Sequence, residues 1–116
     1  MPSTTSYRRG DIVLVSFPFT DLSSTKRRPA VVVSPDPFNA RKQDLILVAI
    51  TSQIGDDPQI VLLEDGDFRE GRLPRRSVVK LTKLFTMHSS LIVKTICTLK
   101  HEKIDEILRD LRDFLS

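Results

Sequence analysis

Three consecutive cations, Lys26, Arg27 and Arg28, stand immediately before a proline and a run of β-branched residues. Pro29 disfavours the helical region for Arg28 and favours an extended backbone there. Because proline has no N–H to give to a β-ladder, it fits the first residue of a strand, which is predicted over residues 30–34. Cations held at the entrance of a buried strand are better placed to bind a polyanion than to pack in a hydrophobic core. The planar guanidinium of Arg28 can also grip two phosphate oxygens at once, which an ammonium cannot.

A second group of polar side chains follows another buried strand. Thr51, Ser52 and Gln53 come directly after the continuous aliphatic run 45–50. The Thr51 hydroxyl can donate a hydrogen bond to a nonbridging phosphate oxygen. Threonine at such a position also forms turns by bonding its own backbone, and the residues alone leave both interpretations open.

The sequence contains few candidate metal ligands that could act together, so it gives little support to metal-dependent chemistry. His88 and His101 lie thirteen positions apart, with no clustered set of carboxylates and histidines. The single cysteine, Cys97, excludes an intrachain disulfide and a cysteine-based zinc site, and it favours a reducing compartment. Fixed cations are therefore the expected means of stabilising a negatively charged transition state.

Length and composition indicate one small globular domain. A chain of 116 residues, 40% of them hydrophobic, can bury roughly two-thirds of its unfolded surface. Its charge is unevenly distributed: residues 69–83 hold six bases and one acid, whereas residues 56–67 hold five acids and no base. Localised basic patches suit nucleic acid, although charged blocks are also ordinary solvated surface. No apolar stretch approaches the ~20 residues that span a bilayer, and no secretory signal is visible, so a soluble cytoplasmic protein is expected.

The elements that must position these groups are mostly short strands. Residues 1–9 are expected to be a flexible tail, and residues 10–116 a single domain. Strands are predicted over residues 12–17, 30–34, 45–50, 60–63, 77–81 and 92–97, with a mobile loop over 64–74. Short strands at short spacing favour a small barrel over a sandwich. From Lys100 onward one apolar face recurs at helical spacing, through Ile104, Ile107, Leu108, Leu111, Phe114 and Leu115.

Three segments resemble the MazF/PemK family of type II toxin–antitoxin toxins in order and spacing. They are residues 10–15 (GDIVLV), 26–34 (KRRPAVVVS) and 49–53 (AITSQ). The resemblance implies a mainly β fold with a C-terminal helix (α+β), an SH3-like small barrel of the PemK/CcdB type, assembled as a homodimer. It implies a metal-independent endoribonuclease without cofactors that cuts single-stranded RNA, often mRNA, in a sequence-selective way. Cleavage would use the neighbouring 2′-hydroxyl and leave cyclic phosphate and 5′-hydroxyl ends, and a cognate antitoxin would cover the RNA groove.

The resemblance also assigns roles to individual residues. Arg28 and Thr51 match the catalytic arginine and threonine. The pKa of an arginine is too high for a general base, so physics assigns Arg28 to transition-state stabilisation. Contacts to RNA are expected from Lys26, Arg27, Ser52, Gln53, Lys80 and Lys83, with Arg75 and Arg76 behind them.

The chain departs from the family pattern at the general base. Several family members carry an acid or a histidine just before the Arg-Pro pair, where this chain reads Ser23-Ser24-Thr25-Lys26. The nearest acid, Asp21, is the candidate base, although an aspartate there is also a common turn residue. A histidine is chemically suited to this role, but no motif places His88 in the site.

Two other functions remain open at this point. Topoisomerase-poisoning toxins share the barrel without cutting RNA, and their function lies in their C-terminal residues. This chain ends in an ordinary helix and keeps Arg28 and Thr51. A decayed paralogue that binds RNA or antitoxin without cutting is the other alternative.

Overall fold

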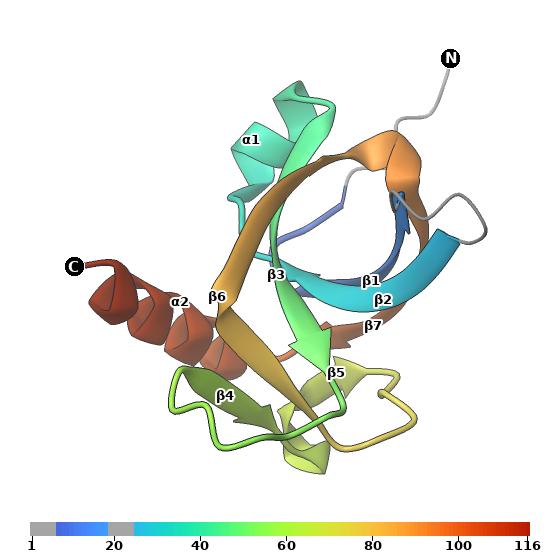
Figure 1. Cartoon of the computed structure of the whole chain (residues 1–116). Helices are drawn as coiled ribbons and strands as arrows, with labels where there is room; N and C mark the ends of the chain where they lie inside the picture. The colour runs from blue at the N-terminus through green and yellow to red at the C-terminus, as the bar shows by residue number, and fades with distance from the viewer. Residues whose placement is uncertain (1–6, 19–24) are drawn as a thin grey trace.

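A computed structural model of the chain describes residues 7–18 and 25–116. Within these residues, strands form one seven-stranded antiparallel sheet in the order β4-β6-β3-β2-β1-β7-β5. The sheet curls into a half-barrel, and a C-terminal helix packs beside it (Figure 1). The strands are β1 (Asp11–Pro18), β2 (Thr25–Val32), β3 (Asp44–Thr51), β4 (Ile60–Leu63), β5 (Phe68–Glu70), β6 (Ser77–His88) and β7 (Ile92–Leu99). The helices are α1 (Asp36–Arg41) and α2 (His101–Leu115), with short 3₁₀ turns η1 (Asp65–Asp67) and η2 (Ser89–Leu91). The expected small barrel with a C-terminal helix is confirmed.

The apolar runs of the three central strands, residues 12–15, 30–32 and 45–50, supply buried side chains to both faces of the sheet. Alternate residues of β1, β2 and β3 enter two separate core clusters. In β2, for example, Val31 belongs to the cluster beneath α2, whereas Ala30 and Val32 belong to the other. The second cluster extends to Phe85 and to Phe17, whose ring centroids are 5.3 Å apart. Phe17 is therefore a core residue.

The helix α2 was predicted, but its apolar face is shorter than expected. Ile104, Ile107 and Leu111 are buried in the first cluster. Phe114 and Leu115, in the last turn, are 39% and 61% exposed. Neither helix of the described residues has the length and apolarity that a bilayer crossing requires.

Several predicted boundaries were wrong. The strand expected at residues 30–34 begins at Thr25 and ends at Val32, so Pro29 lies inside β2. The strand expected at 77–81 continues to His88, where its second half pairs with the beginning of β3. The loop expected over 64–74 contains η1 and the short strand β5, which pairs with β7.

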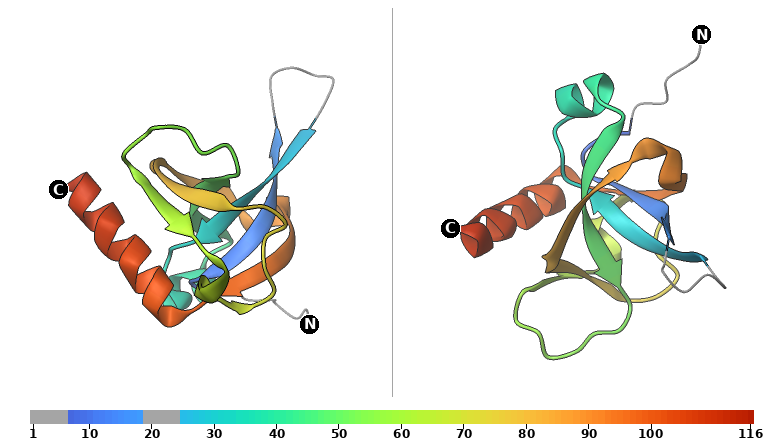
Figure 2. Two further views of the ribbon diagram at one scale, coloured as in Figure 1. Left: turned by 90° about the horizontal axis from the view of Figure 1, so that it is seen from below. Right: turned by 45° about the horizontal axis from the view of Figure 1, so that its top comes forward.

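The helix α1 was missed because Pro35 and Pro37 were interpreted as ending a strand. Pro37 occupies the first turn of α1, where the backbone N–H has no intrahelical partner to lose. Buried Asn39 fixes the helix: its side-chain amide donates to the Ser34 carbonyl at 3.0 Å, and the Ser34 hydroxyl donates to the Asn39 amide oxygen. The helix α1 lies at the opposite end of β3 from the 52–59 connection (Figure 2).

The N-terminal tail expectation falls partly on residues 1–6, which lie outside the described residues. Arg9 is hydrogen-bonded: its backbone N–H donates to Asp36 Oδ1 at 2.8 Å and its Nε to the Val33 carbonyl at 2.7 Å. Cys97 is buried, and burial raises the pKa of its thiol to about 11, with the Asp11 carboxylate adding a smaller effect. The thiol therefore stays protonated near neutral pH and packs as an apolar residue.

Candidate functional site

A hollow of about 310 Å³ opens where β3 ends beside the middle of β2. Three separate segments build it: β2, the end of β3 with the residues that follow, and the segment before β6. Its lining residues are Arg27, Arg28, Pro29, Ile50, Thr51, Ser52, Gln53, Leu73, Pro74, Arg75 and Ser77. The hollow thus brings together Arg28 and Thr51, the two residues that the sequence placed at the centre of the chemistry.

The strand register explains this meeting. β2 and β3 are antiparallel, with Ala30 opposite Ala49. Arg28 and Thr51 lie two residues beyond this pair, at the same end of the ladder, and both line the hollow. The two motifs are therefore positioned by a single strand pairing.

Pro29 has a different role from the one expected. The Val32 carbonyl accepts a hydrogen bond from Gly10, on the β1 side, whereas the Val33 N–H donates to Ile46 on the β3 side. Because backbone groups alternate along a strand, the Pro29 nitrogen faces β3. It has no proton to donate there, and the β2–β3 ladder begins at Ala30. Proline thus ends the pairing of β2 with β3, whereas Arg28 remains paired with Val15 of β1.

The Thr51 hydroxyl combines the two roles proposed from the sequence. Its Oγ1 accepts a hydrogen bond from the Gln53 N–H at 3.1 Å, which closes the polar turn after β3. The hydroxyl proton is not used by that bond and remains available to donate. A turn-forming threonine can therefore also present a donor to the hollow.

The hollow is electropositive. It contains the guanidinium groups of Arg27, Arg28 and Arg75, and no carboxylate is part of its described lining. Among the described residues, none of these three side chains has an ion-pair or hydrogen-bonding partner, and Arg27 and Arg28 are exposed. Thr51, Ser52, Gln53 and Ser77 add neutral polar groups. Unneutralised arginines beside hydroxyl and amide donors suit a phosphodiester.

The segment 71–76 completes the hollow, and the sequence analysis had placed it in a mobile loop. Gly71 adopts φ +68°, and a Cβ there would lie 3.0 Å from both the Cys97 Cβ and the Ile96 carbonyl oxygen. Leu73 is buried in the first core cluster. These two anchors hold the segment against the barrel, so Arg75 is carried on a fixed support. The density of basic residues over 69–83 was the only sequence signal of this contribution.

The remaining predicted site residues lie outside the lining of this hollow. Lys26 is exposed on β2, two residues before Arg28. Lys80 is half-buried on β6 and lies two residues from Val78, which pairs with Thr51. Lys83 is exposed further along β6. Asp21, the candidate general base, falls outside the described residues.

His88 is separated from this site. It is the last residue of β6, where it pairs with Asp44 at the beginning of β3. Its Nε2 lies 2.9 Å from Gln43 Oε1 and its Nδ1 lies 2.8 Å from Ser90 Oγ. In the described part of the chain, no three His, Cys, Asp or Glu side chains are grouped to hold a metal ion.

Comparisons with known proteins identify the family of this chain. Residues 8–115 match the family model described as "PemK-like, MazF-like toxin of type II toxin-antitoxin system". Endoribonuclease MazF6 of Mycobacterium tuberculosis and Endoribonuclease MazF2 of Mycobacterium bovis are each 28% identical over 94 residues, covering 78% of this chain and 80% of theirs.

Solved structures share the whole fold. A MazE–MazF crystal structure from Deinococcus radiodurans aligns with a TM-score of 0.79 at 21% identity, covering 97% of both chains. A mycobacterial endoribonuclease in complex with its cognate antitoxin aligns with a TM-score of 0.73 at 18% identity, covering 97% of this chain and 95% of the other.

Proposed function

Because this chain belongs to the PemK-like, MazF-like toxins of type II toxin–antitoxin systems, we propose that it is an endoribonuclease that cuts single-stranded RNA in the hollow between β2 and β3. One observation carries the proposal: Arg28 and Thr51 line one electropositive hollow that has no carboxylate in its described lining. The relatives named as endoribonucleases support the same activity. The toxin acts on cellular mRNA in the cytoplasm and so inhibits translation and growth.

The reaction is an in-line transfer within the RNA itself. The 2′-oxygen of one nucleotide forms a bond to the adjacent phosphorus, and the bond from phosphorus to the 5′-oxygen of the next nucleotide breaks. The products are a cyclic phosphate and a 5′-hydroxyl end, with no metal ion taking part. Charge increases on the nonbridging oxygens in the transition state, and donors fixed in advance stabilise that charge most effectively.

The site residues divide this work. The Arg28 guanidinium donates two parallel hydrogen bonds to the nonbridging oxygens, and the Thr51 hydroxyl donates to one of them. Ser52 and Gln53 contact sugar or base edges. Lys26, Arg27, Lys80 and Lys83 contact phosphates along the strand and position it without selecting its sequence.

The general base comes from outside the described lining. The described lining holds no Asp, Glu, His, Lys, Cys or Tyr, the side chains that usually serve as general bases. Asp21 is the acid nearest to Arg28 in the segment before β2. We assign to it the removal of the 2′-hydroxyl proton, and Asp21→Asn is the variant that tests this role.

Two partners follow from the same proposal. A cognate antitoxin covers the hollow; the solved structures of a mycobacterial endoribonuclease with its cognate antitoxin and of MazE–MazF support a partner of this kind. A second copy of the chain forms a homodimer and extends the RNA groove. Sedimentation of the purified toxin at the mass of a monomer would contradict a groove built from two subunits.

The deciding experiment is cleavage of a long single-stranded RNA in excess EDTA, followed by mapping of the ends. We expect discrete cuts with 5′-hydroxyl ends for the wild type and none for Arg28→Ala. Intact RNA together with inhibition of a topoisomerase would identify a noncatalytic toxin instead. Intact RNA that shifts in a gel would identify an RNA-binding paralogue without activity.

A further inference from the structure

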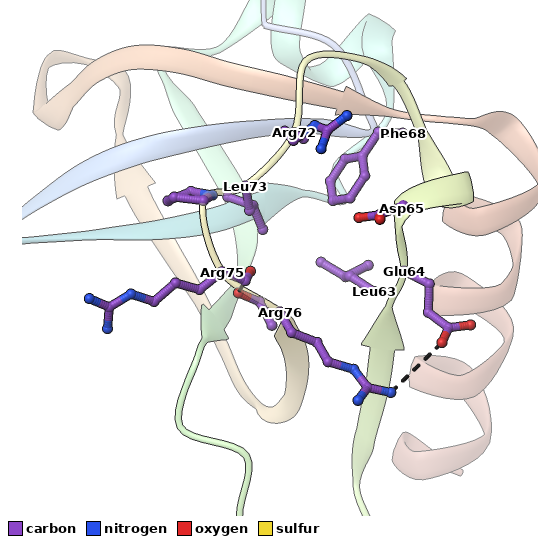
Figure 3. A pocket seen from close by; sticks show the side chains of 10 residues that line it. Leu63, Glu64, Asp65, Phe68, Arg72, Leu73, Arg75 and Arg76 are labelled. Carbon is purple, nitrogen blue, oxygen red and sulfur yellow. Dashed lines mark hydrogen bonds and ion pairs between the residues drawn. The ribbon is translucent and has the colours of Figure 1, made fainter.

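A second hollow, of about 360 Å³ (Figure 3), adjoins the first and shares the 73–77 segment with it. Leu73, Pro74, Arg75 and Ser77 line both hollows. The other lining residues are Leu63, Glu64, Asp65, Phe68, Arg72 and Arg76. An RNA strand with its scissile phosphate at Arg28 therefore has this hollow directly next to it.

The two charge blocks of the sequence meet across this second hollow. Glu64 and Asp65 come from the acidic block and lie on one wall, whereas Arg72 and Arg76 come from the basic block and lie on the other. Arg76 forms an exposed ion pair with Glu64, with 3.8 Å between Nη2 and Oε2. Among the described residues, Asp65 has no such partner, and its carboxylate points into the hollow in Figure 3.

The floor between these walls is apolar and includes an aromatic ring. Leu63 and Leu73 are core residues, and Phe68 packs against the same cluster with its ring at the hollow. The volume falls in the ~300–1,000 Å³ range of small-molecule sites. Bases of single-stranded RNA are commonly stacked on aromatic side chains or on arginine planes and read along their hydrogen-bonding edges.

The carboxylates determine which part of RNA fits. A carboxylate accepts hydrogen bonds and donates none, so it repels a phosphate and attracts base N–H groups. Guanine offers a ring N–H beside an amino group, and cytosine and adenine each offer an amino group. Uracil offers a single N–H flanked by two carbonyl oxygens. These oxygens are hydrogen-bond acceptors, so a carboxylate placed against them repels them.

We propose that this second hollow binds one base of the RNA beside the cut and selects bases with an exocyclic amino group over uracil. Asp65 is the specificity-determining residue, the Phe68 ring is the stacking surface, and Arg75 holds the phosphate that joins the two hollows. This inference rests on the proposed function, because it places the RNA strand by its scissile phosphate.

The test is selection of bound RNA from a randomised single-stranded pool of 2′-O-methyl RNA, followed by sequencing. This RNA lacks the nucleophilic hydroxyl, so selection reports binding whether or not the protein cuts. We expect uracil to be depleted at one position by about fivefold or more in RNA bound by the wild type. Asp65→Asn should largely remove that depletion, because an amide can also donate to a uracil carbonyl. Asp105→Asn is the matched control, since Asp105 is exposed on α2 outside both hollows, and it should leave the depletion unchanged.

Each other outcome overturns the inference. Depletion at no position, or depletion that persists in Asp65→Asn, would show that the hollow does not read a base. An unchanged RNA pattern with weaker antitoxin binding by Asp65→Asn would assign the hollow to the protein partner. If one of these outcomes occurs with a wild type that cuts natural RNA in EDTA, the proposed function stands and only this inference fails. A wild type that neither binds nor cuts RNA fails both.

Discussion

The shape of the Arg28 side chain, as well as its charge, is expected to matter for cleavage. Arg28→Lys keeps the positive charge but loses the planar fork that holds two oxygens at once. Because the loss of one donor to a developing oxyanion typically costs 10²–10³ in rate, we expect kcat to fall by about a hundredfold. The measurement is single-turnover cleavage of a short RNA.

Arg109→Lys is the control for that substitution. Arg109 is exposed on α2 and lines neither hollow, so its replacement should leave the rate unchanged. Near-normal cutting by Arg28→Lys would refute a bidentate role for Arg28.

Thr51 allows its structural and chemical roles to be separated. Thr51→Val removes both the acceptor for the Gln53 N–H and the donor to phosphate, whereas Thr51→Ser retains both. We expect Thr51→Val to lose only about 1 kcal/mol of unfolding free energy while losing most of its activity, and Thr51→Ser to recover both. Urea unfolding and cleavage rates measured on the same samples decide the matter. Full activity in Thr51→Val would reduce Thr51 to a turn residue.

Among the elements, the 71–76 segment depends on one glycine. Gly71→Ala introduces a Cβ at positive φ and 3.0 Å from two atoms of β7, so we expect a loss of at least about 1 kcal/mol of stability. Gly66→Ala is the matched control, because a Cβ there meets no atom within 4 Å. Urea midpoints of the two variants provide the measurement. Equal midpoints would show that the segment is not anchored at Gly71.

The strands and the site were predictable from the sequence to different degrees. The buried runs of β1 and β3 were evident because both faces are apolar. The presence of Arg28 and Thr51 in one hollow followed from motifs that the resemblance supplied. The extension of β6 was hidden by Thr82 and Lys83, which break the apolar pattern on a strand whose second half is half-exposed. The contribution of Arg75 depends on the packing of Gly71 against β7, and that close approach has no signature in local sequence.

At the scale of the whole molecule, the basic residues should control how RNA binding responds to salt. For single strands, log K falls with log salt at a slope of about −0.7 for each phosphate contact. Arg75→Ala and Lys83→Ala should each weaken binding and make the slope shallower by about 0.7. Lys42→Ala, beyond α1 at the opposite end of β3, should leave the slope as it is. Titrations at several salt concentrations will show whether Lys83, which lies outside both hollows, contacts the strand. An unchanged slope would remove it from the RNA path.

The burial of β2 on both faces has a consequence for how the toxin loses its activity. Ala30, Val31 and Val32 are fully buried and follow Arg28 directly in the same strand. Their amide protons should therefore exchange with solvent only when the whole molecule unfolds. Arg28 shares a strand with these buried residues, so inactivation by heat or denaturant should coincide with global melting. An antitoxin that silences such a protein should therefore act by blocking its surface rather than by opening the barrel.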